Sequence, residues 1–416
     1  GRRPFHYMLE NSIPVLISLI GLIIFVGYLA SRFFDRTKIP DVLFLILLGV
    51  LLGPIFHVLD GSVLIDLAPL IGSIALIIIV FEGGTKLNFF EVIEELPESI
   101  WFTVAVSGFT AIAVMLVFLF GAGFDWIRSL LAGIIVAGTS YEIIAPLVAK
   151  LTVTEKVKTL LNLESALNDV VTIIGMVIMI QLFTHAGEPI FPIQLFISTF
   201  AIAILLGAIA GAVWLKVLEN FKGKQFEYLL TLGFVFLLYS GSEALQGNGI
   251  TSVMLFGLIL GNAPALAKLF SIKEDFDLDP AIRNFNSEVS FFVRTMFFVY
   301  VGVVISFEDL TQDIIIIAFL MFVASLIARF AAVRLLTSMN KSLRGSDFII
   351  TAMLPRGLAT AVLATIPITY GINLGAILEI TLLFMIFTDI FGTIAAYYFE
   401  TKLAARASSA STQMKK

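Results

Sequence analysis

The chain has 416 residues, of which 59% are hydrophobic and only 14% are charged, and its formal net charge at pH 7 is -5. Soluble domains carry about a quarter charged residues, so this composition excludes an ordinary soluble enzyme and indicates a polytopic membrane protein. Cysteine is absent, which excludes disulfides, thiolate metal sites and cysteine nucleophiles. The basic residues are dispersed in short loops and form no nucleic-acid-binding face.

Apolar runs of membrane-spanning length follow one another along almost the whole chain and predict about thirteen transmembrane helices. The predicted spans are 12–31, 40–53, 67–83, 99–121, 127–148, 160–183, 190–215, 226–240, 250–267, 287–305, 313–333, 347–369 and 375–399. The fold class is therefore an all-α membrane protein with one transmembrane domain over residues 1–401. Residues 402–416 are rich in Ala, Ser and Thr and are expected to form a disordered cytoplasmic tail.

Lys and Arg residues between these spans gather on one side of the membrane. Only Arg2, Arg3 and Arg128 fall on the opposite side. The positive-inside rule then predicts a multi-pass protein of the cell membrane with its N-terminus outside and its C-terminus in the cytoplasm. An odd number of helices with an outward N-terminus suggests two inverted six-helix repeats and one extra helix, an arrangement typical of secondary transporters.

Two spans are interrupted by glycine, proline and polar residues. The fifth carries Thr139, Ser140 and Glu142, and the twelfth carries Arg356 within residues 353–360. Such broken helices mark midplane ion or substrate sites in transporters. Unwound carbonyls and the Thr139 hydroxyl are candidate cation ligands, with Ser140 at the same break. Glu142 either contributes to the ion path or is a buried, hydrogen-bonded acid.

The sixth span contains the strongest functional signal. Glu164, Ser165, Asn168 and Asp169 fall at helix positions i, i+1, i+4 and i+5, so their side chains share one face. Ionisable residues at this depth are functional by default. We expect Asp169 to bind either a proton or a monovalent cation, because each neutralises a buried carboxylate, and Ser165 and Asn168 to supply further oxygen ligands. The alternative is a structural aspartate that caps an irregular helix.

The roles of the other buried charged residues are predicted from the free-energy cost of an unpaired charge in the membrane. An unpaired arginine at a helix centre costs about 2.5–3.5 kcal/mol, so Glu164 and Arg356 are expected to form a structural ion pair, the alternative being direct ion binding by Glu164. Glu82, at the end of the third span, is either part of the ion path or an ordinary helix-end glutamate. Arg294 and Arg329 are expected to have structural or snorkelling roles.

Five segments contain further motifs, namely 39–54, 81–84, 164–169, 297–302 and 355–358. These motifs occur in the order seen in sodium/proton exchangers of the NhaP and NHE type, within the cation:proton antiporter superfamily, which the chain therefore resembles from Ile39 to about Tyr398. The resemblance implies a homodimer. Predicted helices 1–3 and 8–10 would form a dimerisation bundle, and predicted helices 4–6 and 11–13 would form an ion-binding core that contains two crossed, unwound helices. It also implies that Asp169 is the exchanging carboxylate, with Ser165 and Thr139 as further ligands and with Glu164 and Arg356 as a core-stabilising ion pair.

One departure bears on the transported ion. The family usually has Thr-Asp-Pro at the break in the fifth span, where this chain has Thr139-Ser140-Tyr141. The missing carboxylate leaves four alternatives. Sodium is bound weakly, or potassium is preferred, or Glu142 carries the charge instead, or the chain is a transport-impaired homologue. The adjacent Asn168-Asp169 pair goes with electroneutral exchange in the superfamily.

The predicted function is thus exchange of Na⁺ or K⁺ for H⁺ by alternating access, without an enzymatic activity or a cofactor. The partners are the cation, the proton, the lipid bilayer and a second copy of the chain. An ion channel is the rival class, but the chain contains no repeated Thr-Val-Gly-Tyr-Gly filter. An intramembrane hydrolase is disfavoured because neither a Gly-x-Ser-x-Gly motif nor a Gly-x-Gly-Asp motif is present.

Overall fold

The computed structural model describes residues 17–18, 20–33, 41–59, 68–86, 97–184, 193–221, 227–266, 280–305, 311–340 and 343–414. Within these ranges all regular secondary structure is helical. Five of the described helices are each long and apolar enough to cross a bilayer, namely Ser99–Ala122, Ser198–Glu219, Ser287–Val304, Gln312–Met339 and Ile377–Thr401. The all-α membrane fold is therefore confirmed, and the count of thirteen spans stays a prediction.

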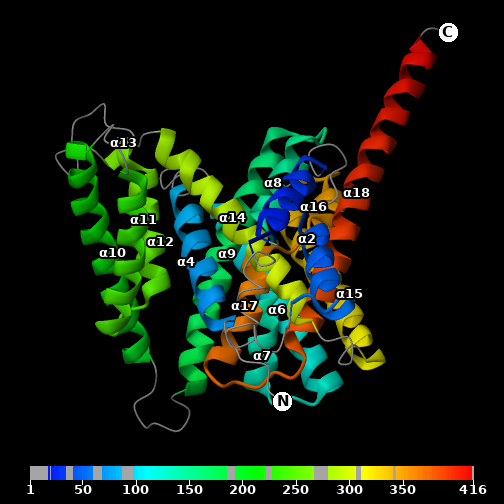
Figure 1. Ribbon diagram of the computed structural model, residues 1–416. Coiled ribbons are helices and arrows are strands. Elements are labelled where there is room, and N and C mark those ends of the chain that lie inside the picture. Colours follow the sequence, from blue (N-terminus) through cyan, green and yellow to red (C-terminus); the bar gives the residue numbers. More distant parts are fainter. Residues whose placement is uncertain are drawn as a thin grey trace.

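The contacts between the helices divide them into two packed groups. The first group contains α2 (Asp41–Val50) with its π-helical continuation η1 (Leu51–Ile55), α4 (Ala68–Lys86), α10 (Ile193–Phe221), α11 (Glu227–Ala244), α12 (Gly249–Gly261), α13 (Ala263–Leu266) and α14 (Pro280–Val304). In it, α12 packs against α4 and α10, and α14 packs against α2 and α4. Helices α10, α11 and α12 of the first group lie at the left in Figure 1. The α4–α12 contact is close because Gly257 has no Cβ, which would lie 2.6 Å from the Phe81 carbonyl oxygen.

The second group contains the polar helices singled out by the sequence. Its members are α6 (Pro97–Val117) with η3 (Phe118–Ala122), α7 (Trp126–Ile135), α8 (Tyr141–Ala149), α9 (Glu155–Thr184), α15 (Gln312–Met339), α16 (Asp347–Ala352), α17 (Leu358–Thr369) and α18 (Ile377–Met414). Helix α6 packs against α7, α9 and α15, and α15 packs against α18. The two groups meet where α17 packs against α4.

The fifth and twelfth predicted spans are each broken into two helices. The fifth becomes α7 and α8, separated by residues 136–140, and the twelfth becomes α16 and α17, separated by residues 353–357. In the second break Pro355 has no N–H to donate, and Gly357 has an extended backbone with φ -126°. The prediction of two broken helices is therefore confirmed.

The prediction of a disordered tail after Thr401 is wrong. Helix α18 begins at Ile377 and continues to Met414, past the end of the last predicted span. The segment after Thr401 contains several alanines, which have the highest helix propensity. Adding residues to an existing helix also avoids the cost of nucleation, so a composition that is poor at starting a helix can still prolong one.

Candidate functional site

The two breaks cross in direct contact. The Ser140 N–H donates to the carbonyl oxygen of Pro355 at 3.0 Å. A Cβ at Gly357 would overlap the Ser140 hydroxyl, so glycine is what allows the two unwound segments to approach this closely. Ser140 is the N-cap of α8, and its side chain makes no capping hydrogen bond.

Arg356 stabilises the crossing through backbone carbonyls. Its Nε donates to the Val136 carbonyl at 2.8 Å and its Nη1 to the Leu354 carbonyl at 2.9 Å. These carbonyls follow the C-terminal ends of α7 and α16, where the helix dipoles place partial negative charge. The backbone N–H of Arg356 donates to Asp389 Oδ1 in α18 at 3.0 Å. A single buried guanidinium therefore neutralises two helix ends, and Asp389 holds the backbone of the second break.

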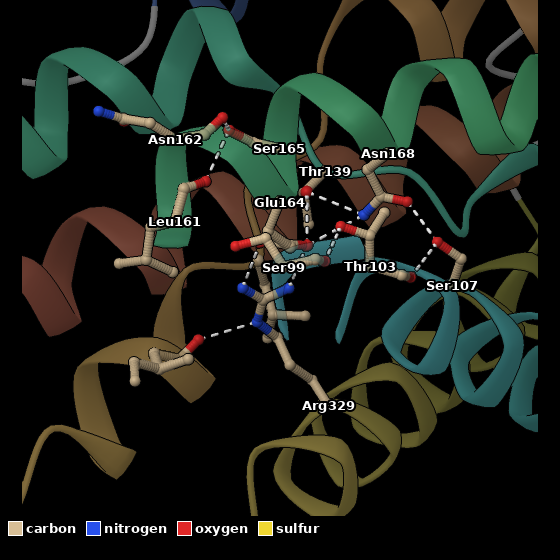
Figure 2. Close-up of polar contacts among 12 residues, drawn as sticks. Ser99, Thr103, Ser107, Thr139, Leu161, Asn162, Glu164, Ser165, Asn168 and Arg329 are labelled. Atoms are coloured by element: carbon tan, nitrogen blue, oxygen red, sulfur yellow. Dashed lines mark hydrogen bonds and ion pairs between the residues drawn. The ribbon is translucent and has the colours of Figure 1, made fainter. Parts of the chain in front are cut away.

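The predicted ion pair between Glu164 and Arg356 is wrong, because the partner of Glu164 is Arg329 of α15. Arg329 Nη1 and Nη2 lie 3.0 and 2.9 Å from Glu164 Oε1 and Oε2, a two-pronged contact (Figure 2). Both side chains are 0% exposed, and Arg329 Nε donates to the Ile350 carbonyl. Of the two roles expected for Arg329, structural or snorkelling, the structural one is confirmed, since its charge is neutralised inside the protein.

A hydrogen-bond network links Glu164 to the break in the fifth span. Thr139 Oγ1 donates to Glu164 Oε1 at 3.0 Å, and Asn168 Nδ2 lies 3.0 Å from both Thr139 Oγ1 and Glu164 Oε1 (Figure 2). All three side chains are fully buried. The structure thus brings Glu164 and Asn168 together, as the helical spacing predicted, and adds Thr139 from the break. Because the Asn168 amide and the Thr139 hydroxyl bond to protein groups, their direct binding of an ion stays a prediction.

A polar stripe on α6 completes the network and was missed by the sequence analysis. Ser107 Oγ hydrogen-bonds Asn168 Oδ1, so both ends of the Asn168 amide are held. Ser107 Oγ also lies 2.7 Å from the Thr103 carbonyl, and Thr103 Oγ1 donates to the Ser99 carbonyl. The signal was the recurrence of hydroxyl residues at i, i+4 and i+8 of an otherwise apolar helix, which places them on one face.

The remaining predicted ligands on α9 are placed only in part. Ser165 is 0% exposed, and its hydroxyl donates back to the carbonyls of Leu161 and Asn162 in its own helix. Asp169 belongs to α9 by its backbone. Its side chain, like that of Glu142, lies outside the described residues. Their roles remain predictions from the sequence.

Glu82 lies apart from this network, in α4. It pairs with Lys86 at 2.6 Å, and Ser287 Oγ lies 3.4 Å from Glu82 Oε1. These residues line a cleft of about 410 Å³ together with Arg294 and with Tyr141, the residue that follows Ser140. The cleft therefore connects Glu82 with the start of α8.

A second cleft, of about 350 Å³, lies between the two groups of helices. Its lining includes Ile173 of α9, Tyr239 and Glu243 of α11, and Leu363 of α17. Ile173 is one helical turn beyond Asp169. Helices α8 and α17, which line the first and second clefts respectively, extend from the crossing toward opposite ends of the molecule (Figure 1). Each break is thus followed by a helix that lines a cleft.

This chain is similar in sequence to a known family of membrane proteins. Residues 21–400 match the family model described as sodium/hydrogen exchanger, transmembrane. A K(+)/H(+) antiporter NhaP2 of Shewanella baltica is 29% identical over 389 residues, which are 90% of this chain and 64% of that protein. The chain therefore spans just under two thirds of the length of that relative. Na(+)/H(+) antiporter 1 of Methanocaldococcus jannaschii is 26% identical over 71% of this chain and 69% of its own length.

A solved structure has the same fold. The sodium proton antiporter MjNhaP1 from Methanocaldococcus jannaschii at pH 8 superposes with a TM-score of 0.76 at 22% sequence identity, covering 94% of this chain and 99% of that one.

Proposed function

Since the chain belongs to the sodium/hydrogen exchanger family, we propose that it is a secondary antiporter that exchanges a monovalent cation for a proton. The observation that carries the proposal is the contact between Ser140 and Pro355, where two broken helices cross beside the polar face of α9. One cleft lies along α8 and a second along α17, the two helices that begin at the breaks. Unwound backbone at such a crossing offers carbonyl oxygens to a cation without any extra charge.

The geometry favours Asp169 over Glu164 as the exchanging acid. Both carboxylate oxygens of Glu164 accept hydrogen bonds from Arg329, and Oε1 accepts two more, from Thr139 and Asn168. These hydrogen bonds hold the Glu164 carboxylate in place as the partner of Arg329, so we infer that Glu164 has a structural role and that another acid carries the exchange. Asp169 lies five residues further along the same helix. Proton and cation then compete for one carboxylate.

This one-acid scheme makes transport electroneutral. One proton leaves for each monovalent cation bound, so a full cycle moves no net charge. Alternating access would come from movement of the group that contains α6–α9 and α15–α18 relative to the group that contains α2, α4 and α10–α14. By resemblance, predicted helices 1–3 and 8–10 supply the interface of a homodimer. The N-terminus is proposed to be outside and the C-terminus in the cytoplasm.

Transport by the purified protein in proteoliposomes tests the proposal. We expect Na⁺ or K⁺ gradients to drive proton movement that saturates with cation concentration. An imposed membrane potential should not drive cation uptake, although each net charge crossing would respond to about 2.3 kcal/mol per 100 mV. Potential-driven exchange would mean that a second acid titrates, Glu142 being the first candidate. Unsaturable, pH-independent flux would indicate a channel and contradict the proposal.

Ser140 is expected to set cation affinity. We expect Ser140→Asp to tighten Na⁺ binding and to shift the pH profile of exchange, because the new carboxylate sits at the positive N-terminal end of α8 and competes for the same proton and cation. Ser140→Asn is the matched control, since it has the same shape without the charge. The measurement is the apparent Michaelis constant for Na⁺ and K⁺ at several pH values. Equal constants for the two variants would show that the charge at this position does not matter.

A further inference from the structure

A cleft of about 330 Å³ lies where α15 ends and α16 begins. It is lined by Arg334, Thr337, Ser338, Arg344 and Asp347. Arg344 Nε donates to the Thr337 carbonyl at 3.4 Å, so the loop between the helices folds back onto the end of α15. Gly345 makes this turn with a φ of 94°, a conformation that glycine adopts without strain.

The charged side chains that line this cleft do not form ion pairs with one another. Among the described residues, neither Arg334 nor Arg344 forms an ion pair, and Asp347 forms none either. Asp347 Oδ1 is buried and accepts no hydrogen bond from any described group. A buried acceptor without a donor is destabilising, which favours a bound molecule that supplies the donor. The two arginines of the cleft can therefore bind an anion, and its carboxylate can accept a hydrogen bond from a bound donor.

The position of the cleft along α15 matches the boundary of a bilayer. At about 1.5 Å per residue, Arg334 lies about 33 Å along the helix from Gln312, close to the ~30 Å thickness of the hydrocarbon core. Ile327 and Met339 of α15 are 63% and 68% exposed, and Phe348 at the start of α16 is 48% exposed. The polar cleft is thus bordered by apolar side chains that can contact acyl chains. It lies on the side where the basic loops gather.

We propose that this cleft binds the headgroup of a phosphatidylethanolamine lipid. The phosphate would lie between the guanidinium groups of Arg334 and Arg344, which are suited to phosphate by charge and by planar donor geometry. The ammonium group would donate to Asp347 Oδ1. Phosphatidylcholine offers the same phosphate, but its quaternary ammonium has no N–H. The carboxylate therefore selects between the two headgroups.

Lipid binding to the purified, delipidated full chain tests the proposal. Native mass spectrometry would measure binding of phosphatidylethanolamine, phosphatidylcholine and phosphatidylglycerol with matched acyl chains, and of soluble phosphoethanolamine. We expect phosphatidylethanolamine to bind roughly tenfold more tightly than phosphatidylcholine, the value of one charge-assisted hydrogen bond. Asp347→Asn should remove this preference, whereas Arg344→Gln and Arg334→Gln should weaken binding of all three lipids.

Arg128→Gln is the control, because it removes an exposed arginine that pairs with Asp125 far from the cleft. Its lipid binding should be unchanged. Equal binding of phosphatidylethanolamine and phosphatidylcholine by the unmodified protein would overturn the proposal. So would an unchanged preference in Asp347→Asn, or unchanged affinities in both arginine variants. Equally strong binding of soluble phosphoethanolamine would assign the cleft to a free phosphate ester and overturn the lipid as its source.

Discussion

Replacing Asp169 with asparagine is expected to abolish cation-dependent proton exchange while the protein remains folded. The substitution preserves the shape of the side chain but removes the group that binds either a proton or a cation. Glu164 cannot substitute for it, because its carboxylate is held by Arg329. The measurement is proton movement in proteoliposomes under a Na⁺ or K⁺ gradient, where the variant should match protein-free vesicles.

Glu155→Gln is the matched control for Asp169→Asn. Glu155 belongs to the same helix, but its side chain is 85% exposed and pairs with Lys158 in the next turn. Its replacement should leave exchange unchanged. The melting temperature of each variant in detergent separates a lost transport site from a lost fold. Exchange retained by a folded Asp169→Asn protein would contradict the assignment of Asp169 as the carrier.

Replacing Arg329 with methionine is expected to destabilise the protein by about 3–5 kcal/mol, because it leaves the buried Glu164 carboxylate without its counter-charge. Both side chains are 0% exposed, so water cannot take the place of the lost partner. The additional change Glu164→Gln should recover part of this loss, since a neutral amide keeps hydrogen-bonding capacity toward Thr139 and Asn168 without a buried charge. The measurement is thermal unfolding of each variant in detergent.

A double-mutant cycle identifies the partner of Glu164. Strong coupling is expected between Glu164→Gln and Arg329→Met, and weak coupling between Glu164→Gln and Arg356→Met, because Arg356 bonds backbone carbonyls. Arg128→Met should be nearly neutral, as expected of an exposed ion pair. Additive effects for Glu164 and Arg329 would contradict the pairing that the structure shows.

Local features of the sequence predicted most of the fold. Apolar runs of about 20 residues define membrane helices because the bilayer leaves no water to satisfy an unpaired backbone. Glycine, proline and polar residues within two of these runs indicated both breaks, since proline removes a backbone donor and polar side chains are costly in lipid. The spacing of Glu164 and Asn168 also placed them on one face of a helix, as the structure confirms.

Pairing between distant segments was decided only by the tertiary structure. The sequence contains several buried arginines and several acids, and the cost of an unpaired charge requires that partners exist without saying which they are. Packing of α15 and α9 around α6 brings Arg329 to Glu164, and the crossing of the two breaks gives Arg356 the carbonyls of Val136 and Leu354. Hydrophobic periodicity determines which face of a helix is buried, whereas contacts between polar groups far apart in the chain depend on how those faces meet in three dimensions.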